Sequence, residues 1–189
     1  QNNVSGINAS ELWGRIDEDR FTSMPAEGIA LIESDTQLAN VEKQNLADMI
    51  ENFRTNLNHL DRSGFDVCLI DTAPTLSNAL VGALASADYV VSPIELEVYS
   101  IQGIKKMLTT FTQVKRKMNR KLEFIGMVPS KVDGRNPRHV SHLQELKTAY
   151  PTLIVPVSVG LRNSIADALA SHVPVWKIKK TAARKASQE

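Results

Sequence analysis

The stretch "FDVCLIDTAPT" (residues 65–75) decides the fold. In it an apolar run that includes Val67, Cys68 and Ile70 leads directly into the carboxylate of Asp71, and Thr-Ala-Pro-Thr follows. A short continuous apolar run bounded by a proline is typical of a buried strand. We therefore predict a buried strand over residues 65–71 that ends on a charged residue, with Cys68 as a core thiol.

Comparable apolar runs alternate with helical patterns along most of the chain. Before residue 29 the sequence predicts no strand, and only a short helix around residues 11–16. Strands made of continuous apolar runs that alternate with helices are typical of a parallel sheet with helices on both faces. We therefore predict a single α/β domain over residues 1–189 with a doubly wound, mostly parallel sheet. Its strands are expected at residues 29–34, 65–71, 88–95, 122–130 and 152–157, and its helices at 35–60, 76–86, 101–118, 137–149 and 164–171.

The composition is that of a soluble globular protein, with 42% hydrophobic and 23% charged residues. No apolar run approaches the roughly 18 residues of a membrane span, and no secretory signal is visible, so we expect a cytoplasmic protein. The charge is unevenly distributed: residues 1–103 carry 5 Lys/Arg and 16 Asp/Glu, whereas residues 104–189 carry 17 and 5. The basic half is suited to binding a polyanion, or the two halves neutralise each other in the fold.

Polar or turn-forming residues follow several of the expected strands. In open α/β sheets, ligands bind outside the carboxyl ends of the strands, so these residues are expected to line a ligand site. Asp71 is the sharpest candidate, since an apolar strand that ends in Asp is the pattern of a Walker B carboxylate, which holds Mg²⁺ beside nucleotide phosphates. The alternative is an ordinary strand-end Asp that caps the next helix. Four histidines show no convincing metal spacing.

The sequence downstream of Asp71 resembles the ParA/MinD family of deviant Walker A ATPases, which are P-loop NTPases. The family pattern is Asp-x-x-Pro after a strand, a small-residue helix, a strand of the form AADxVhhPhxxE and a helix that contains a glycine. Residues 29–189 carry the resemblance, which is nearest to the plasmid-partition ParA branch, of the IncC type. The matching residues are Asp71 to Pro74, the run from Ala87 to Pro93, Glu95 and Gly103.

The resemblance implies an ATPase that dimerises with ATP, binds DNA non-specifically and is stimulated by a ParB-type centromere-binding protein at the nucleoid. It implies that Asp71 acts on Mg²⁺ through water and that Thr72, Ala73 and Pro74 sense the γ-phosphate. Residues in the positions of the family's adenine pocket are Ser130, Lys131 and Pro156. Residues expected at DNA are Arg135, Arg162, Lys179, Lys180, Arg184 and Lys185, together with the basic segment 105–121.

The family's glycine-rich loop, KGGxGK[ST], is not found in these 189 residues. Because that loop cradles and neutralises the phosphates, we expect the chain alone not to hydrolyse ATP. Either the chain is part of a longer ATPase or it is a fragment without the loop. Two other functions stay open: a non-hydrolysing adaptor of the same fold, and a membrane-positioned relative of the MinD type, whose amphipathic C-terminal helix the lysine-rich tail does not show.

Overall fold

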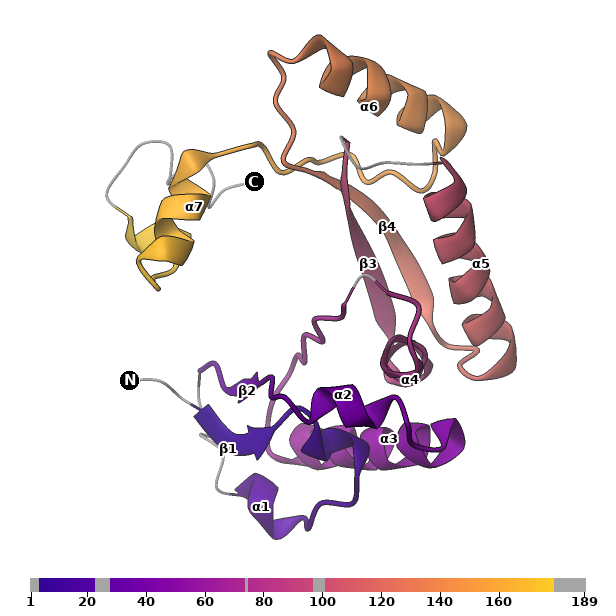
Figure 1. The fold of residues 1–189 in the computed structure, drawn as a ribbon, viewed down its shortest axis with the longest axis vertical. Helices are drawn as coiled ribbons and strands as arrows, with labels where there is room; N and C mark the ends of the chain where they lie inside the picture. The colour runs from indigo at the N-terminus through magenta and orange to yellow at the C-terminus, as the bar shows by residue number, and fades with distance from the viewer. Residues whose placement is uncertain (1–3, 23–27, 74, 97–100, 179–189) are drawn as a thin grey trace. The chain divides into compact units, whose positions relative to one another are not determined.

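A computed structural model describes residues 4–22, 28–73, 75–96 and 101–178 (Figure 1). The chain forms two compact units. Unit 1 comprises residues 1–88 and 113–122, and unit 2 comprises residues 89–112 and 123–189. Whether the two units act as one ATPase-type domain over residues 1–189 stays a prediction.

Unit 1 contains a short parallel pair of strands. β1 (Val4–Asn8) pairs with β2 (Leu31–Glu33), and the Ala9 N–H donates to the carbonyl of Glu33 at 2.9 Å. The prediction of no strand before residue 29 is therefore wrong. The local sequence is short and polar. Ile7 anchors it in the core, and the strand depends on a ladder with a distant partner that no local pattern reveals.

The helices of unit 1 pack around one apolar cluster. η1 (Glu11–Trp13), α1 (Asp19–Thr22), α2 (Leu38–Val41), α3 (Leu46–Arg62) and α4 (Asn78–Ser86) contribute to it. The single helix expected over residues 35–60 is two helices, because Asn45 adopts an extended conformation and its side chain accepts from the N–H groups of Ala47 and Asp48. This is an N-cap, which starts α3 afresh. The rings of Trp13 and Phe53 stack at 4.1 Å between centroids.

Residues 65–73 run as an extended segment that forms no ladder with any strand the structure describes. Along it Val67 is 73% and Leu69 92% exposed, and Cys68 is exposed too. The predictions of a buried strand over residues 65–71 and of a core thiol are therefore wrong here. An apolar run is compatible with a strand, but only a neighbour's backbone groups make it one.

Unit 2 is built on a second parallel pair. β3 (Tyr89–Glu95) pairs with β4 (Glu123–Ser130) from Tyr89 opposite Glu123 to Glu95 opposite Ser130, with one register shift between Val90 and Val91. The helices are α5 (Ile101–Lys117), α6 (Pro137–Ala149) and α7 (Asn163–Ala170), followed by η2 (Val175–Lys177). All three helices lie within two residues of the predicted bounds. The last residues of α5 belong to unit 1.

The strand expected at residues 152–157 is reduced to a single bridge between Ile154 and Met127. Gly126 allows that close approach: its φ is +147°, and a Cβ there would lie 2.8 Å from the carbonyl oxygen of Leu153. The core of unit 2 is formed by Leu96, Ile104, Met127, Leu146 and Ile154. Parallel strands joined through helices confirm the α/β class. Across the described residues, no helix is both long and apolar enough to span a membrane.

Candidate functional site

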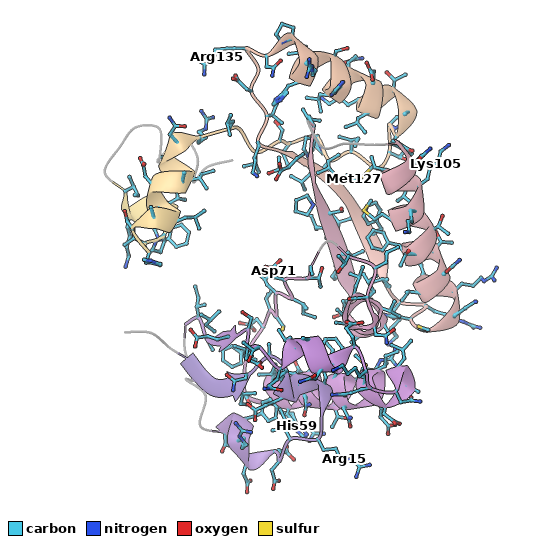
Figure 2. The ribbon with its side chains drawn as sticks, viewed as in Figure 1. Arg15, His59, Asp71, Lys105, Met127 and Arg135 are labelled. Carbon is cyan, nitrogen blue, oxygen red and sulfur yellow. The ribbon has the colours of Figure 1, made fainter. Side chains whose placement is uncertain are left out.

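The turn that carries the expected Mg²⁺ carboxylate belongs to unit 1. Asp71 lies on the segment that joins α3 to α4 (Figure 2), and Asp71, Thr72 and Ala73 are exposed. Pro74 lies outside the described residues. Among the described residues, no ion pair or hydrogen bond is recorded for the Asp71 carboxylate. Asp71 therefore does not cap α4, and its oxygens stay available to a cation.

The N-terminus of α4, which follows this turn, is capped by other residues. The Ser77 hydroxyl accepts from the Leu80 N–H at 3.1 Å. The carboxylate of Glu42, directly after α2, accepts from the N–H groups of Asn78 at 2.8 Å and Ala79 at 3.1 Å. A carboxylate at a helix N-terminus is favoured by the helix dipole as well as by these bonds. Sequence reasoning missed Glu42, because no local pattern links it to a helix that begins 36 residues later.

At the end of β4, unit 2 presents two of the residues expected near adenine. Ser130 is half-buried and lies opposite Glu95 at the ends of the paired strands. Lys131, in the left-handed region at φ 53°, forms an ion pair through Nζ with the Glu95 carboxylate. Both side chains are exposed, so the pair is a weak one that water and ions screen. The sequence singled out Glu95 but not this contact.

The loop after Lys131 is fixed by backbone and side-chain hydrogen bonds. The Val132 N–H donates to the carbonyl of Val159 at 3.0 Å, which aligns the loop with residues 159–161. The Asp133 N–H donates to Nδ1 of the buried His139 at 3.1 Å. The Arg135 N–H donates to the Asp133 carboxylate at 3.0 Å and lowers the pKa of that carboxyl, with a further contribution from the Arg135 side chain.

Arg135 extends from this loop into solvent (Figure 2), with 94% of its side chain exposed. That orientation suits a contact with a large partner, as expected for a DNA-contacting residue. Arg162 occupies the N-cap position of α7 and is half-buried, so it is less accessible than Arg135. Pro156 is exposed on the segment beside β4. The expected residues Lys179, Lys180, Arg184 and Lys185 lie outside the described residues.

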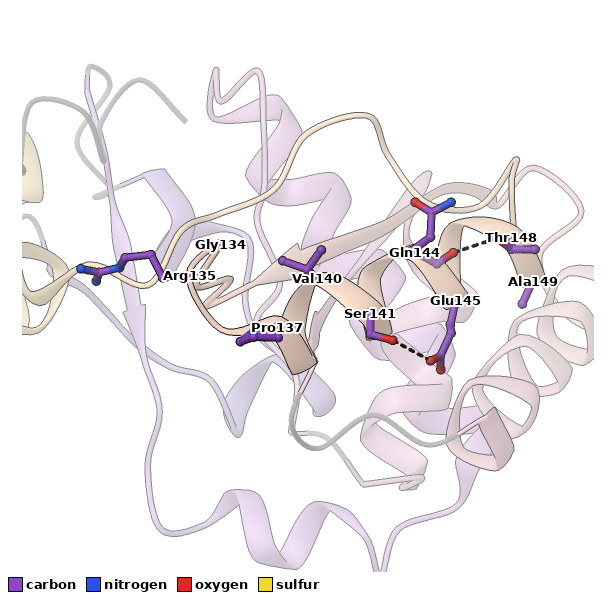
Figure 3. A pocket seen from close by; sticks show the side chains of 9 residues that line it. All are labelled: Gly134, Arg135, Pro137, Val140, Ser141, Gln144, Glu145, Thr148 and Ala149. Atoms are coloured by element: carbon purple, nitrogen blue, oxygen red, sulfur yellow. Dashed lines mark hydrogen bonds between the residues drawn. The ribbon is translucent and has the colours of Figure 1, made fainter.

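An open concavity of about 900 Å³ lies along the outer face of α6 and the loop before it (Figure 3). The Ser141 hydroxyl donates to Glu145 at 3.1 Å, and the Thr148 hydroxyl donates to the Gln144 carbonyl at 2.9 Å. Both hydroxyls therefore have their partners within α6 itself. The concavity is lined by Gly134, Arg135, Pro137, Val140, Ser141, Gln144, Glu145, Thr148 and Ala149. Of the expected site residues that the structure describes, Arg135 alone lines it.

The expected nucleotide residues thus fall into two sets. Asp71, Thr72 and Ala73 belong to unit 1, and Ser130, Lys131 and Pro156 belong to unit 2. No group of three His, Cys, Asp or Glu side chains suited to a metal is found in the described residues. Mg²⁺ commonly uses one or two carboxylates together with waters and substrate phosphates. The free carboxylate of Asp71 and the exposed hydroxyl of Thr72 fit that kind of binding.

The chain is similar in sequence to a known protein family and to several of its members. A family model described as an AAA domain matches residues 12–124. Protein IncC of Escherichia coli is 60% identical over 193 residues, which cover 98% of this chain and 53% of that protein. The chromosome-partitioning ATPase Soj of Thermus thermophilus is 29% identical over 117 residues, which cover 59% of this chain and 47% of Soj. The chain spans about half the length of its IncC relatives, 53% and 52%.

A solved structure supports the fold. The crystal structure of cobyrinic acid a,c-diamide synthase from Mycobacterium smegmatis with bound ADP and magnesium matches at a TM-score of 0.68, with 22% identity. The match covers 93% of this chain and 74% of that one. The family match spans more than half of the chain and includes the Asp71 turn, α4 and β3. The chain therefore belongs to the ParA/MinD family of deviant Walker A P-loop ATPases, in its IncC-type plasmid-partition branch.

Proposed function

We propose that this chain serves plasmid or chromosome partition as part of an ATPase that dimerises with ATP, binds DNA non-specifically and responds to a ParB-type centromere-binding protein. The observation that carries the proposal is the 60% identity to protein IncC across 98% of the chain. The Soj relative, a chromosome-partitioning ATPase by name, supports the same reading. Such a protein would act in the cytoplasm, on the nucleoid.

In this proposal each set of residues has its own task at the nucleotide. When bound, Mg²⁺ neutralises the phosphate charge that develops during hydrolysis. Asp71 would hold the ion's water ligands through its unpaired carboxylate. Thr72, Ala73 and Pro74 would sense the γ-phosphate, while the Glu42 carboxylate keeps the N-terminus of α4 in place behind them.

The adenine side would be formed by Ser130, Lys131 and Pro156 in unit 2. Lys131 reaches a ligand only by leaving Glu95, and an exposed ion pair is worth about 1 kcal/mol or less, so the exchange is easy. Arg135 and Arg162 would contact DNA, together with Lys179, Lys180, Arg184 and Lys185. These roles follow from the positions that the family shares with this sequence.

We further propose that the 189-residue chain by itself does not turn over ATP, because its sequence holds no KGGxGK[ST] loop to position and neutralise the phosphates. The same observation favours a second candidate function, a non-hydrolysing adaptor that binds DNA or a protein partner.

Phosphate release from ATP by this chain tests both statements. The variants are Asp71→Ala and, as the matched control, Asp66→Ala, which removes another exposed carboxylate from the same extended segment. Turnover at background for all three chains is the expected result. Turnover that survives Asp66→Ala but is lost in Asp71→Ala would show that the chain is an active ATPase and would exclude the adaptor.

A further inference from the structure

Three large apolar side chains are exposed in and directly after α7 (Figure 1). Leu169 lies in the last turn of α7, Val173 in the turn that follows and Trp176 in η2. They are 73%, 38% and 66% exposed. We define the α7–η2 patch as these three residues together with the exposed Lys177. Single apolar residues are normal on a surface, but an apolar group that includes Trp and borders on charge is typical of a protein interface.

The backbone under the patch is well ordered by hydrogen bonds at the end of α7. His172 adopts the left-handed conformation, with a φ of 51°. The Val173 N–H donates to the Ala168 carbonyl and the His172 N–H to the Leu169 carbonyl, each at 3.1 Å, which is the Schellman pattern of a helix end. The buried side of α7 consists of Ser164 and Ala168. The patch therefore stands on a preorganised base, which reduces the entropy lost when a ligand binds.

Positive charge accompanies the patch. Residues 162–189 carry 6 Lys/Arg and 2 Asp/Glu, a net charge of +4. Lys177 directly follows Trp176, and no ion pair of Lys177 is recorded within the described ranges. A ligand for this surface must therefore bring apolar groups for the patch and negative charge for its border. An amphipathic protein helix with Asp or Glu beside its apolar face meets both requirements.

Other kinds of ligand meet only one of the two requirements. The phosphate backbone of a duplex offers charge but no apolar surface, and a base stacked on Trp176 leaves Leu169 and Val173 in water. A membrane-bound helix inserts a broad apolar face, whereas α7 has eight residues and spans about 12 Å. A second copy of the chain would bring the same positive charge to a symmetric contact.

We propose that the α7–η2 patch docks an acidic amphipathic helix of a protein partner. Leu169, Val173 and Trp176 would contact the apolar face of that helix, with Trp176 as the main anchor, since Trp is enriched among the residues that dominate binding energy. Lys177 would pair with a carboxylate at the edge of the contact. This inference goes beyond the proposed partition function and does not depend on binding of nucleotide or DNA.

The test measures binding of the whole 189-residue chain to a synthetic helix by fluorescence anisotropy, without ATP. The probe is a labelled peptide of about 18 residues, long enough to be helical, with Leu along one face and Glu elsewhere. One control peptide has the same composition with the Leu residues scattered, and another has Lys in place of every Glu. Titrations at low and high salt measure the contribution of charge.

Two variants of the chain remove the two parts of the patch. Leu169→Ser with Trp176→Ser removes apolar anchors, and its control is Val67→Ser with Val140→Ser, which changes two exposed apolar residues elsewhere. Lys177→Glu reverses the charge, and its control is Lys147→Glu on α6. All of these positions are exposed, so folding should tolerate the changes, and circular dichroism melting verifies it.

We expect the unaltered chain to bind the acidic amphipathic peptide more tightly than either control peptide, and less tightly at high salt. The Leu169→Ser, Trp176→Ser variant should lose on the order of a hundredfold in affinity, about tenfold for each anchor. Lys177→Glu should lose about fivefold, and both control variants should stay within about twofold. The emission of Trp176 should also shift to shorter wavelength on binding, since Trp13 is already buried.

No binding of the acidic amphipathic peptide, or equal binding of the scattered peptide, would overturn this inference. So would binding that the patch variants and their controls retain alike. Parallel titrations use duplex DNA, oligo-dT and vesicles of phosphatidylcholine and phosphatidylserine in equal parts, and sedimentation velocity measures self-association. If one of these interactions depends on Leu169 and Trp176 while the peptide does not bind, that ligand replaces the acidic helix. The peptide assay contains neither ATP nor DNA, so its failure leaves the proposed partition function standing.

Discussion

Replacing Gly82 by alanine should destabilise unit 1, although the same change stabilises most helices. Gly82 lies in the middle of α4, where alanine is favoured over glycine by about 1 kcal/mol. A Cβ at this position would lie 2.5 Å from a ring carbon of Trp13. That ring cannot retreat, because it is 5% exposed and stacks on Phe53 with an interplanar angle of 8°.

The two effects can be compared in magnitude. Overpacking a rigid core typically costs about 1–3 kcal/mol, and an overlap this deep with a ring belongs at the upper end. After the gain in helix propensity, we expect a net loss of about 2 kcal/mol in the free energy of unfolding. For a chain of this size that corresponds to a fall in Tm of about 4–8 °C.

A double-mutant cycle isolates the cause. Unfolding in urea, followed by circular dichroism, is measured for Gly82→Ala, Trp13→Phe and the double variant. Phenylalanine lacks the outer ring atoms that lie closest to the new Cβ, so Gly82→Ala should be close to neutral in that background. If Gly82→Ala instead raised the stability of the unaltered protein, the proposed clash between α4 and the Trp13 ring would be refuted.

Three further predictions concern the remainder of unit 1. Glu42→Gln should lower the free energy of unfolding by about 1 kcal/mol and speed hydrogen exchange at the Asn78 and Ala79 amides, because it removes a charged cap from α4. Glu51→Gln is the control. Equal exchange rates at these two amides in the Glu42→Gln and Glu51→Gln variants would contradict the cap. The pKa of Glu11 lies below its ordinary value of 4.5, owing first to the hydrogen bond from Arg20 and then to that from the Asn8 N–H. Its contribution to stability is therefore present above pH 4.5 and is lost as the pH falls through the lowered pKa. In a plot of unfolding free energy in urea against pH, Glu11→Gln should make the fall at acid pH less steep. An unchanged fall would contradict this contribution of Glu11. Cys68 is exposed, so a thiol reagent should label it fully without denaturant, whereas labelling that requires urea would mean that residues 65–71 are buried.

Sequence periodicity predicted the helices well, because a helix satisfies its backbone hydrogen bonds internally. Residues 137–149 were predicted as a helix, and α6 has those bounds, with Asn136 as N-cap and Pro137 in the first turn. The helix expected over residues 35–60 failed only at Asn45, whose cap divides α2 from α3. This error concerns only a helix boundary, and recognising Asn45 as an N-cap residue removes it.

Strands and the site were harder, since both depend on partners that are distant in the sequence. The apolar run at residues 65–71 satisfies a strand pattern, yet a strand needs a second chain segment, and this one has no such neighbour in the described structure. β1 shows the converse: its sequence has only a weak strand pattern, yet it forms a strand because β2 supplies the partner for its ladder. The Glu42 contact with α4 and the Lys131–Glu95 pair are side-chain contacts between separate segments, which no one-dimensional pattern encodes.

In each unit, the groups that cap the helix next to the candidate binding residues are separate from those residues. The N-terminus of α4 is held by Glu42 and Ser77, and that of α6 by Asn136, so neither helix start draws on Asp71 or Lys131. Asp71 therefore has no structural bond to break when it meets a cation. Lys131 has one exposed ion pair to exchange, at a cost of about 1 kcal/mol or less. A ligand at either residue would therefore leave the hydrogen bonds at the starts of α4 in unit 1 and α6 in unit 2 intact.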